Sequence, residues 1–360
     1  MNNIFVRIIT RDKVTLKKCT SNETKYPNGN DKSSNLERVA LMNTNKIMPQ
    51  TGKKYRLITR SDMDGLVCGV LLKELDLIDD ILFAHPKDMQ DGLIDVTQND
   101  ITTNLPYNEG AFLAFDHHAS EASRIEGHPD NHVIDVDAPS AARVVYDYFG
   151  GKETFPRVSD EMMEAVDKAD AAQFSKEEIL SPDGWVLLSF LMDARTGLGR
   201  FRDFNISNYQ LMMKLIDFCR EHNNINEIIE LPDVKERVDI YYNHQLKCRE
   251  QIERCAKVYD NLVVLDLRKE ETIWAGNRFM IYALFPQCNI SIHVIWGKNK
   301  QNTVFATGKS IIDRSSMTDI GDLMLWNGGG GHHAAGTCQI SNMQAEDVLQ
   351  ELIKTINLDG

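Results

Sequence analysis

The chain has 360 residues, of which 42% are hydrophobic and 26% are charged. These values lie near globular averages, which excludes a largely disordered chain and a fibrous repeat, and the length predicts two domains. Charged residues interrupt every apolar stretch well before the roughly 18 residues that a membrane span needs. Seven cysteines without a CxxC pair favour reduced thiols over disulfides. We therefore expect a cytoplasmic protein without a membrane partner.

Charge is distributed unevenly along the sequence. Residues 1–50 contain nine Lys and Arg and four Asp and Glu, so their net charge is +5, whereas residues 51–360 carry a net charge of −18. An acidic surface repels a long phosphate backbone, because nonspecific binding of nucleic acid depends mainly on cationic side chains. We therefore expect any nucleic-acid substrate to be short, or to be reached through bound metal ions.

The N-terminal segment differs in composition from the rest. Residues 1–50 are rich in Asn, Ser, Thr and Lys, and they lack an extended apolar period after the short run FVRII. This composition predicts a disordered tail, with a functional basic arm as the alternative.

Residues 51–200 alternate between strand-like and helical patterns. The predicted strands are 55–59, 80–85 and 111–115, and the predicted helices are 65–75, 140–149 and 160–172. This alternation predicts an N-terminal α/β domain with a mostly parallel sheet.

The remaining residues are predicted to form a helical connector, 201–257, and a second, smaller α/β domain, 258–360. The connector has a helical period over most of its length. Strands of the second domain are predicted at 261–267, 279–285, 290–296 and 303–311, with a hairpin turn at 297–302.

Two aspartates follow the first predicted strand. In the sequence RSDMDGL, Asp62 and Asp64 are two positions apart, where a turning backbone can direct both carboxylates at one cation. Hard divalent ions such as Mg²⁺ and Mn²⁺ prefer oxygen ligands of this kind. Taken alone, the motif is weak evidence for a metal site and favours an ordinary turn.

The sequence FDHHAS follows the buried strand predicted at 111–115 and contains Asp116, His117 and His118. Open α/β sheets bind ligands at the carboxyl ends of their parallel strands. One imidazole can coordinate a metal there while Asp116 orients it. A surface cluster without function is the alternative.

A helical stretch, EAVDKADAA, supplies two further carboxylates. Asp167 and Asp170 are three positions apart, so they share one face of a helix. If that face borders the site, Asp170 can be a distant metal ligand. A solvated acidic stripe is the alternative.

The sequence WNGGGGHHAAGT contains four consecutive glycines at 328–331. Ordering four glycines is costly, which argues against a plain flexible loop, the alternative reading. Their N–H groups can form an anion-binding nest, and His332 can donate to a phosphate oxygen. The following residues, HHAAG, predict the start of a tightly packed helix.

Two other cations are candidates for phosphate contacts. Arg195 lies in a glycine-containing segment between the predicted domains, where it could bind phosphate bidentately or take part in an interdomain ion pair. Lys309 follows a predicted strand of the second domain, where it could face the glycines or end a hairpin.

Together, DMDG, FDHH, a helical aspartate and GGGGHHAAG resemble the DHH superfamily of phosphoesterases with its DHH-associated C-terminal domain, in particular the exopolyphosphatase-like and nanoRNase-like group. The resemblance covers about residues 55–350. It implies a catalytic domain at 51–200, a substrate-binding domain at 258–360, and metal-dependent hydrolysis of a phosphate ester or anhydride.

The resemblance also implies roles for single residues. Asp62, Asp64, His117 and Asp170 would bind metal, and Asp116 and His118 would complete the catalytic motif. The substrate phosphate would be held by Gly329, Gly330, Gly331, His332 and His333.

Two positions depart from the family pattern. Many relatives have a histidine shortly before the first aspartate pair, where this chain has Thr59, Arg60 and Ser61. Relatives also have an aspartate at the end of the strand before DHH, where this chain has Asn104, whose amide can bind a metal but brings no charge. His85 is a candidate to replace the missing imidazole, although a surface or capping role is the default.

These departures predict one firmly bound ion, Mn²⁺ or Mg²⁺, held by Asp64, His117 and Asp170 with help from Asn104. A second ion near Asp62 would be looser or would arrive with the substrate.

We therefore expect a metal-dependent phosphoesterase that cleaves near the end of a small phosphorylated substrate. Short oligonucleotides, dinucleotides, nucleotide phosphates and polyphosphate are the candidate substrates, and short single-stranded nucleic acid is a candidate partner. A homodimer is also compatible with the sequence. The alternative is a catalytically silent nucleotide- or phosphate-binding protein with a degenerate metal site.

Overall fold

A computed structural model describes residues 9–10, 13–14, 46–125, 127, 129–201 and 204–360. The chain divides into two units, Met1–Lys46 and Ile47–Gly360. In the first unit, strand β1 (Ile9–Thr10) pairs antiparallel with β2 (Lys13–Val14). The disorder predicted for residues 1–50 concerns almost entirely residues outside the described ranges.

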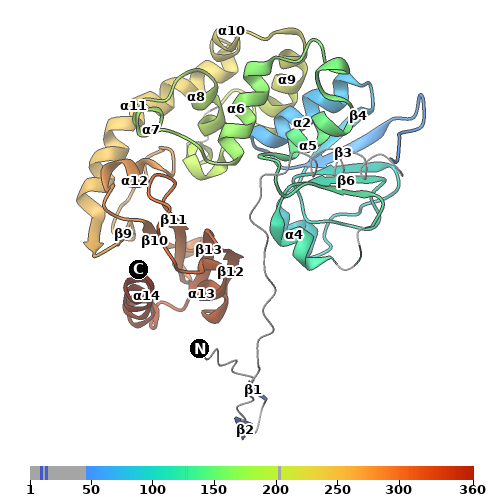
Figure 1. The fold of residues 1–360 in the computed structure, drawn as a ribbon. Helices are drawn as coiled ribbons and strands as arrows, with labels where there is room; N and C mark the ends of the chain where they lie inside the picture. Colours follow the sequence, from blue (N-terminus) through green and yellow to red (C-terminus); the bar gives the residue numbers. More distant parts are fainter. Residues whose placement is uncertain (1–8, 11–12, 15–45, 126, 128, 202–203) are drawn as a thin grey trace, which may run out of the picture. The chain divides into compact units, whose positions relative to one another are not determined.

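The second unit begins with a five-stranded parallel sheet of order β4-β3-β5-β6-β7 (Figure 1). Its strands are β3 (Tyr55–Thr59), β4 (Ile78–Phe83), β5 (Asp100–Thr103), β6 (Leu113–Asp116) and β7 (His132–Ile134). The predicted parallel sheet is therefore confirmed. The sequence prediction assigned no strand to β5 or β7, because both are short and neither has a clear alternating pattern.

Helices of the first sheet and of the connecting region follow in chain order. They are α2 (Met63–Glu74), α3 (Pro86–Gln90), α4 (Ala119–Arg124), α5 (Ala141–Tyr148), α6 (Asp160–Asp170), α7 (Lys176–Leu180), α8 (Gly184–Met192), α9 (Asn208–Glu221), α10 (Ile225–Ile229) and α11 (Pro232–Cys255). Short 3₁₀ turns lie at Gly151–Glu153, Ala194–Thr196 and Leu198–Arg200.

Helix α2 is buried along most of its length, from Met63 to Leu72. It packs against α5, α6 and α9, which explains why its sequence is apolar on every face. A Cβ atom on Gly69 would lie 2.8 Å from Cδ1 of Ile216, so the glycine allows α9 to approach closely. This packing fixes the N-terminal turn of α2, where the first aspartate pair lies.

After α11 the chain enters a second, six-stranded sheet of order β12-β13-β11-β10-β9-β8, in which only β9 and β10 are parallel neighbours. Its strands are β8 (Ala256–Tyr259), β9 (Leu262–Asp266), β10 (Ile290–Trp296), β11 (Thr303–Lys309), β12 (Gly330–His332) and β13 (Ala335–Ile340). Its helices are α12 (Met280–Leu284), α13 (Ile320–Trp326) and α14 (Ala345–Asp359), with a 3₁₀ turn at Lys298–Lys300. The predicted hairpin between β10 and β11 is confirmed.

Two predictions for the second sheet were wrong. Residues 279–285 contain helix α12 where a strand was predicted, because Phe279 to Ala283 are all buried and a short apolar run cannot by itself distinguish a buried helix from a buried strand. Residues 332–336 do not start a helix: His332 ends β12, residues 333–334 form a two-residue turn, and Ala335 begins β13. The domain boundaries at 200 and 257 stay a prediction.

Candidate active site

The first acidic pair lies in the turn between β3 and α2. Asp62 is the N-cap residue of α2, and its Oδ1 accepts a hydrogen bond from the N–H of Gly65 at 3.1 Å. Asp64 follows in the first helical turn and is buried. A Cβ atom on Gly65 would lie 1.9 Å from the carbonyl oxygen of Arg60, so this tight turn requires glycine. The turn directs both carboxylates to the carboxyl end of β3.

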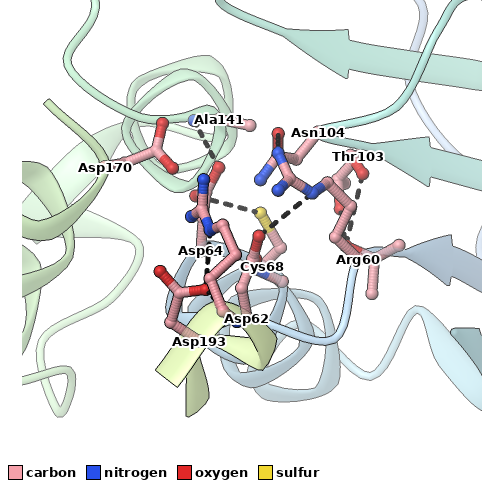
Figure 2. Close-up of polar contacts among 12 residues, drawn as sticks. Arg60, Asp62, Asp64, Cys68, Thr103, Asn104, Ala141, Asp170 and Asp193 are labelled. Atoms are coloured by element: carbon pink, nitrogen blue, oxygen red, sulfur yellow. Dashed lines mark hydrogen bonds and ion pairs between the residues drawn. The ribbon is translucent and has the colours of Figure 1, made fainter. Parts of the chain in front are cut away.

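The carboxylate of Asp64 is held by the first residues of α5. Its Oδ2 accepts a hydrogen bond from the N–H of Ala141 at 3.0 Å, and its Oδ1 accepts one from Ala142 at 2.7 Å (Figure 2). The first N–H groups of a helix have no partner within the helix, and they favour negative charge. Asp64 is thereby fixed in a single orientation.

His117 follows β6 and faces the same acidic centre. Its Nδ1 lies 3.1 Å from the carbonyl oxygen of Ala138, which can only accept, so Nδ1 carries a proton and Nε2 points to the carboxylates. Nε2 lies 2.8 Å from Oδ2 of Asp170, the last residue of α6. One ligand atom from each of Asp64, His117 and Asp170 lies within 4.8 Å of the other two. Three elements distant in sequence therefore converge on one point.

The raised pKa values of Asp64 and His117 indicate that this cluster can bind a cation. Burial, followed by the charges of Asp170 and Asp62, raises the pKa of Asp64 to about 8. Burial opposes a charged imidazole, but the hydrogen bond to Asp170 and the neighbouring carboxylates raise the pKa of His117 to about 9. A divalent ion would neutralise the gathered negative charge in place of these protons. The two carboxylates and the imidazole suit Mn²⁺ or Mg²⁺.

Asp116 organises the two histidines that follow it. Its Oδ1 accepts a hydrogen bond from the backbone N–H of His117 at 2.8 Å and lies 2.7 Å from Nδ1 of His118. Its Oδ2 is buried and has no hydrogen-bond partner among the described residues. Ligand atoms of Asp116, His117 and His118 also lie within 4.8 Å of one another. The centre thus offers two overlapping sets of potential metal ligands that share His117.

Arg60 and Asn104 lie beside the acidic pair. The Nε of Arg60 is 3.1 Å from Oδ2 of Asp62, and its Nη1 is 3.5 Å from Oδ1 of Asn104 (Figure 2). Asn104 is buried, and its backbone has a φ of 54°, in the left-handed region that asparagine tolerates. The sequence prediction treated Asn104 as a metal ligand and gave Arg60 no role, although its position immediately before the aspartate pair was a signal.

A cavity opens from the acidic centre. Figure 2 shows Asp193 beside Asp62 and Asp64. Asp193 accepts from Nε of Arg195 at 2.7 Å, and its other oxygen lies 3.3 Å from Nε of Arg278. The cavity lining includes Asp62, Asp64, Asp170, Asp193, Arg195 and Arg278, together with Phe174, Phe190 and Phe279. Arg195 therefore lies at the site, while Asp193 and Arg278 were not predicted.

The glycine-rich segment forms an exposed edge strand. A Cβ atom on Gly329 would lie 2.0 Å from the carbonyl oxygen of Thr337, and one on Gly331 would lie 2.4 Å from that of Ala335, whereas Gly330 has open space around it. Two of the three glycines thus permit close pairing with β13.

Histidines follow at the end of this strand. The His332 ring lies 6.2 Å from the His118 ring, centroid to centroid. The Nε2 of His333 lies 2.8 Å from Nζ of Lys309, and its Nδ1 lies 3.0 Å from Oδ2 of Asp319. A second cavity is lined in part by Arg60, Asn104, Asp116, His118 and His332. The two sheets therefore contribute side chains to one cavity.

Two residues considered in the sequence lie elsewhere. Asp167 accepts hydrogen bonds from Ser140 at 2.7 Å and from Nε of Arg143 at 3.0 Å, and it belongs to neither set of potential metal ligands. His85 caps helix α3 by accepting a hydrogen bond from the N–H of Lys87. The default expectation for His85, a capping role, matches this position.

Comparisons with known proteins include a close relationship. The chain is 63% identical to a pGpG-specific phosphodiesterase, PggH, from Vibrio cholerae, and the match covers 85% of this chain and all of that one, with a TM-score of 0.75. Together with the motifs, this relationship places the chain in the DHH superfamily of phosphoesterases. It is accordingly a metal-dependent hydrolase of phosphodiester or phosphoanhydride bonds.

Two further similarities are remote. RecJ bound to Mn²⁺ from Thermus thermophilus is 11% identical, with a TM-score of 0.45 over 89% of this chain and 54% of that one. CDC45 from Entamoeba histolytica is 9% identical, with a TM-score of 0.46 over 90% of this chain and 99% of that one. Neither likeness bears on function. No family model and no curated protein matches the chain. Among the described residues, no helix combines the length and the apolar character needed to cross a membrane.

Proposed function

We propose that this protein hydrolyses pGpG, a guanine dinucleotide with a 5′-phosphate, to two molecules of GMP. The observation that carries this proposal is the 63% identity to a pGpG-specific phosphodiesterase over the full length of that relative. The reaction adds water to the internal phosphorus atom and breaks its bond to the 3′-oxygen, which leaves with a proton. A net charge of −18 on residues 51–360 is consistent with a substrate this small.

The metal would be Mn²⁺ or Mg²⁺, held by Asp64, His117 and Asp170. When bound, a divalent ion lowers the pKa of a water molecule and stabilises negative charge on the phosphate. The hydrogen bond from His117 to the carbonyl of Ala138 keeps Nε2 directed at this position. The hydrogen bonds from the first N–H groups of α5 hold the carboxylate of Asp64 in place at this position.

Other residues would act on the substrate. His118 borders the second cavity, and its Nδ1 contacts Asp116. Burial opposes a charged imidazole, but the hydrogen bond to Asp116 raises the pKa of His118. A protonated His118 would be suited to donate a proton to the leaving 3′-oxygen. The phosphates would be bound by Gly329, Gly330, Gly331, His332, His333, Lys309 and Arg195. Lys309 and Asp319 flank the His333 ring and would fix its orientation.

The test is the turnover of pGpG by purified protein with MnCl₂, with GMP measured by chromatography. We expect two GMP per pGpG, loss of activity on chelation, and a loss of at least about 10²-fold in His117→Ala. His222→Ala is a matched control, because His222 pairs with Glu227 on the surface and should retain wild-type turnover. An inert wild-type protein, or equal turnover by His117→Ala, would refute the proposal.

A further inference from the structure

The carboxyl end of β3 carries a positively charged side chain inside the acidic centre. Arg60 follows β3 and begins the turn that leads to α2. Its carbonyl oxygen is packed against Gly65, because a Cβ atom on Gly65 would lie 1.9 Å from this oxygen. The backbone of Arg60 therefore has little freedom to move. Its guanidinium reaches Asp62 at 3.1 Å and Asn104 at 3.5 Å. The Arg60 side chain is only 28% exposed.

The potential metal ligands of the centre form two sets that share His117, one with Asp64 and Asp170 and the other with Asp116 and His118, and the carboxylate of Asp62 lies outside both. Asp64, His117 and Asp170 lie within 4.8 Å of one another and can hold one ion. Asp62 belongs to no such group among the described residues, and its Oδ2 faces the guanidinium of Arg60 instead. A second divalent ion beside Asp62 would compete with Arg60 for Oδ2 of Asp62, and it would meet a permanent positive charge.

Asn104 also disfavours a second metal ion beside Asp62. A neutral amide cannot compensate the charge of a second ion, but its Oδ1 can accept a hydrogen bond from a guanidinium. The backbone N–H of Asn104 donates to the carbonyl of Phe115 at 3.0 Å, which fixes the residue between β5 and β6. Its Nδ2 is buried without a hydrogen-bond partner in the described chain, and it lines the same cavity as Arg60.

We propose that the guanidinium of Arg60 takes the place of a second metal ion, so that the protein binds one divalent ion and Arg60 supplies the other positive charge to the scissile phosphate. Two-metal phosphoesterases place their ions about 3.5–4 Å apart to stabilise charge on both sides of phosphorus. A guanidinium can bind two phosphate oxygens at once through parallel N–H groups. Arg60 would make and break no bond. This role rests on the proposed phosphodiesterase activity.

The first test counts metal ions without measuring activity. Native mass spectrometry and equilibrium dialysis with Mn²⁺ should give one ion per wild-type chain. The double variant Arg60→His with Asn104→Asp removes the guanidinium and adds an imidazole and a carboxylate, so it should bind two. Arg157→His is the matched control, because Arg157 pairs with Glu74 away from the centre, and it should bind one. Two ions of similar affinity in the wild type, or one in the double variant, would overturn the proposal.

The second test separates charge from metal binding. Arg60→Ala should still bind one Mn²⁺ but lose about 10²-fold or more in kcat on pGpG, and millimolar guanidinium should restore part of the loss. Wild-type kcat in Arg60→Ala, loss of its Mn²⁺, or absence of rescue would count against the role. If the wild type does not cleave pGpG, the phosphodiesterase proposal fails, while the ion count still decides whether Arg60 excludes a second metal.

Discussion

The residues around Asp64 hold more protons in the metal-free native protein than in the unfolded chain. Burial and neighbouring carboxylates raise the pKa of Asp64 to about 8, and Asp170 raises that of His117 to about 9 against the effect of burial. The unfolded values are about 3.9 and about 6.5. His117 therefore stabilises the fold fully below about pH 6.5 and loses this effect towards 9, whereas Asp64 increasingly opposes folding above about pH 3.9.

Both contributions predict that the free energy of unfolding of the metal-free protein falls between pH 6.5 and 8. Urea denaturation after chelation measures this dependence. In Asp64→Asn the decrease should be smaller, because one of the two titrating groups is absent. Stability that rises over this interval would contradict the described cluster.

For single residues, the sequence predicts part of the site. Asp62 and Asp64 lie in the turn and first helical residues after β3, and Asp116 ends β6 with His117 directly after it, so their position at the carboxyl edge follows from local patterns. The contact of Asp170 with His117 spans 53 residues, and the helical spacing of Asp170 left open whether its face borders the site.

Arg60 and Asn104 show what a single sequence does not contain. They are 44 residues apart, and their contact depends on the pairing of β3 with β5. No local pattern specifies which strands become neighbours in a parallel sheet. The sequence shows that Arg60 and Asn104 each depart from the family pattern. It does not show that the two side chains contact each other, because that contact depends on the fold.

Among the elements, the hairpin of β12 and β13 gives a direct test. Gly331 pairs with Gly336, and a Cβ atom on Gly331 would lie 2.4 Å from both the carbonyl oxygen of Ala335 and the Cα of Gly336. We expect Gly331→Ala to lower the free energy of unfolding by about 1–3 kcal/mol, because backbone atoms must separate.

Gly330→Ala is the comparison for this variant, since a Cβ atom there meets nothing within 4 Å. Urea denaturation should show a change within about 0.5 kcal/mol for Gly330→Ala. Equal stability of the two variants would mean that the glycines do not pair as described.

The same hairpin explains an incorrect prediction. The run HHAAG has small residues that suit a helix, but His332 pairs with Ala335 across a two-residue turn. Local propensity is a weak guide where a neighbouring strand, here β11, provides hydrogen bonds to β13.

For the whole molecule, the uneven charge predicts selectivity for short substrates. Residues 51–360 carry a net charge of −18, so a longer phosphate backbone meets more repulsion outside the site. We expect kcat/KM for a 5′-phosphorylated decanucleotide to be lower than for pGpG. Raising KCl from about 0.05 M to about 0.5 M should reduce the difference, because salt screens repulsion. Preference for the longer RNA at low salt would contradict this account.

The central claim is that Asp64, His117 and Asp170, supplied by three separate elements, hold one divalent ion. Anomalous diffraction from crystals soaked with Mn²⁺, recorded at the manganese edge, tests it most directly. The account predicts one strong peak in contact with these three side chains, and the guanidinium of Arg60 still at Asp62. A peak absent from this position, or a second peak of similar height beside Asp62 with Arg60 displaced, would contradict it.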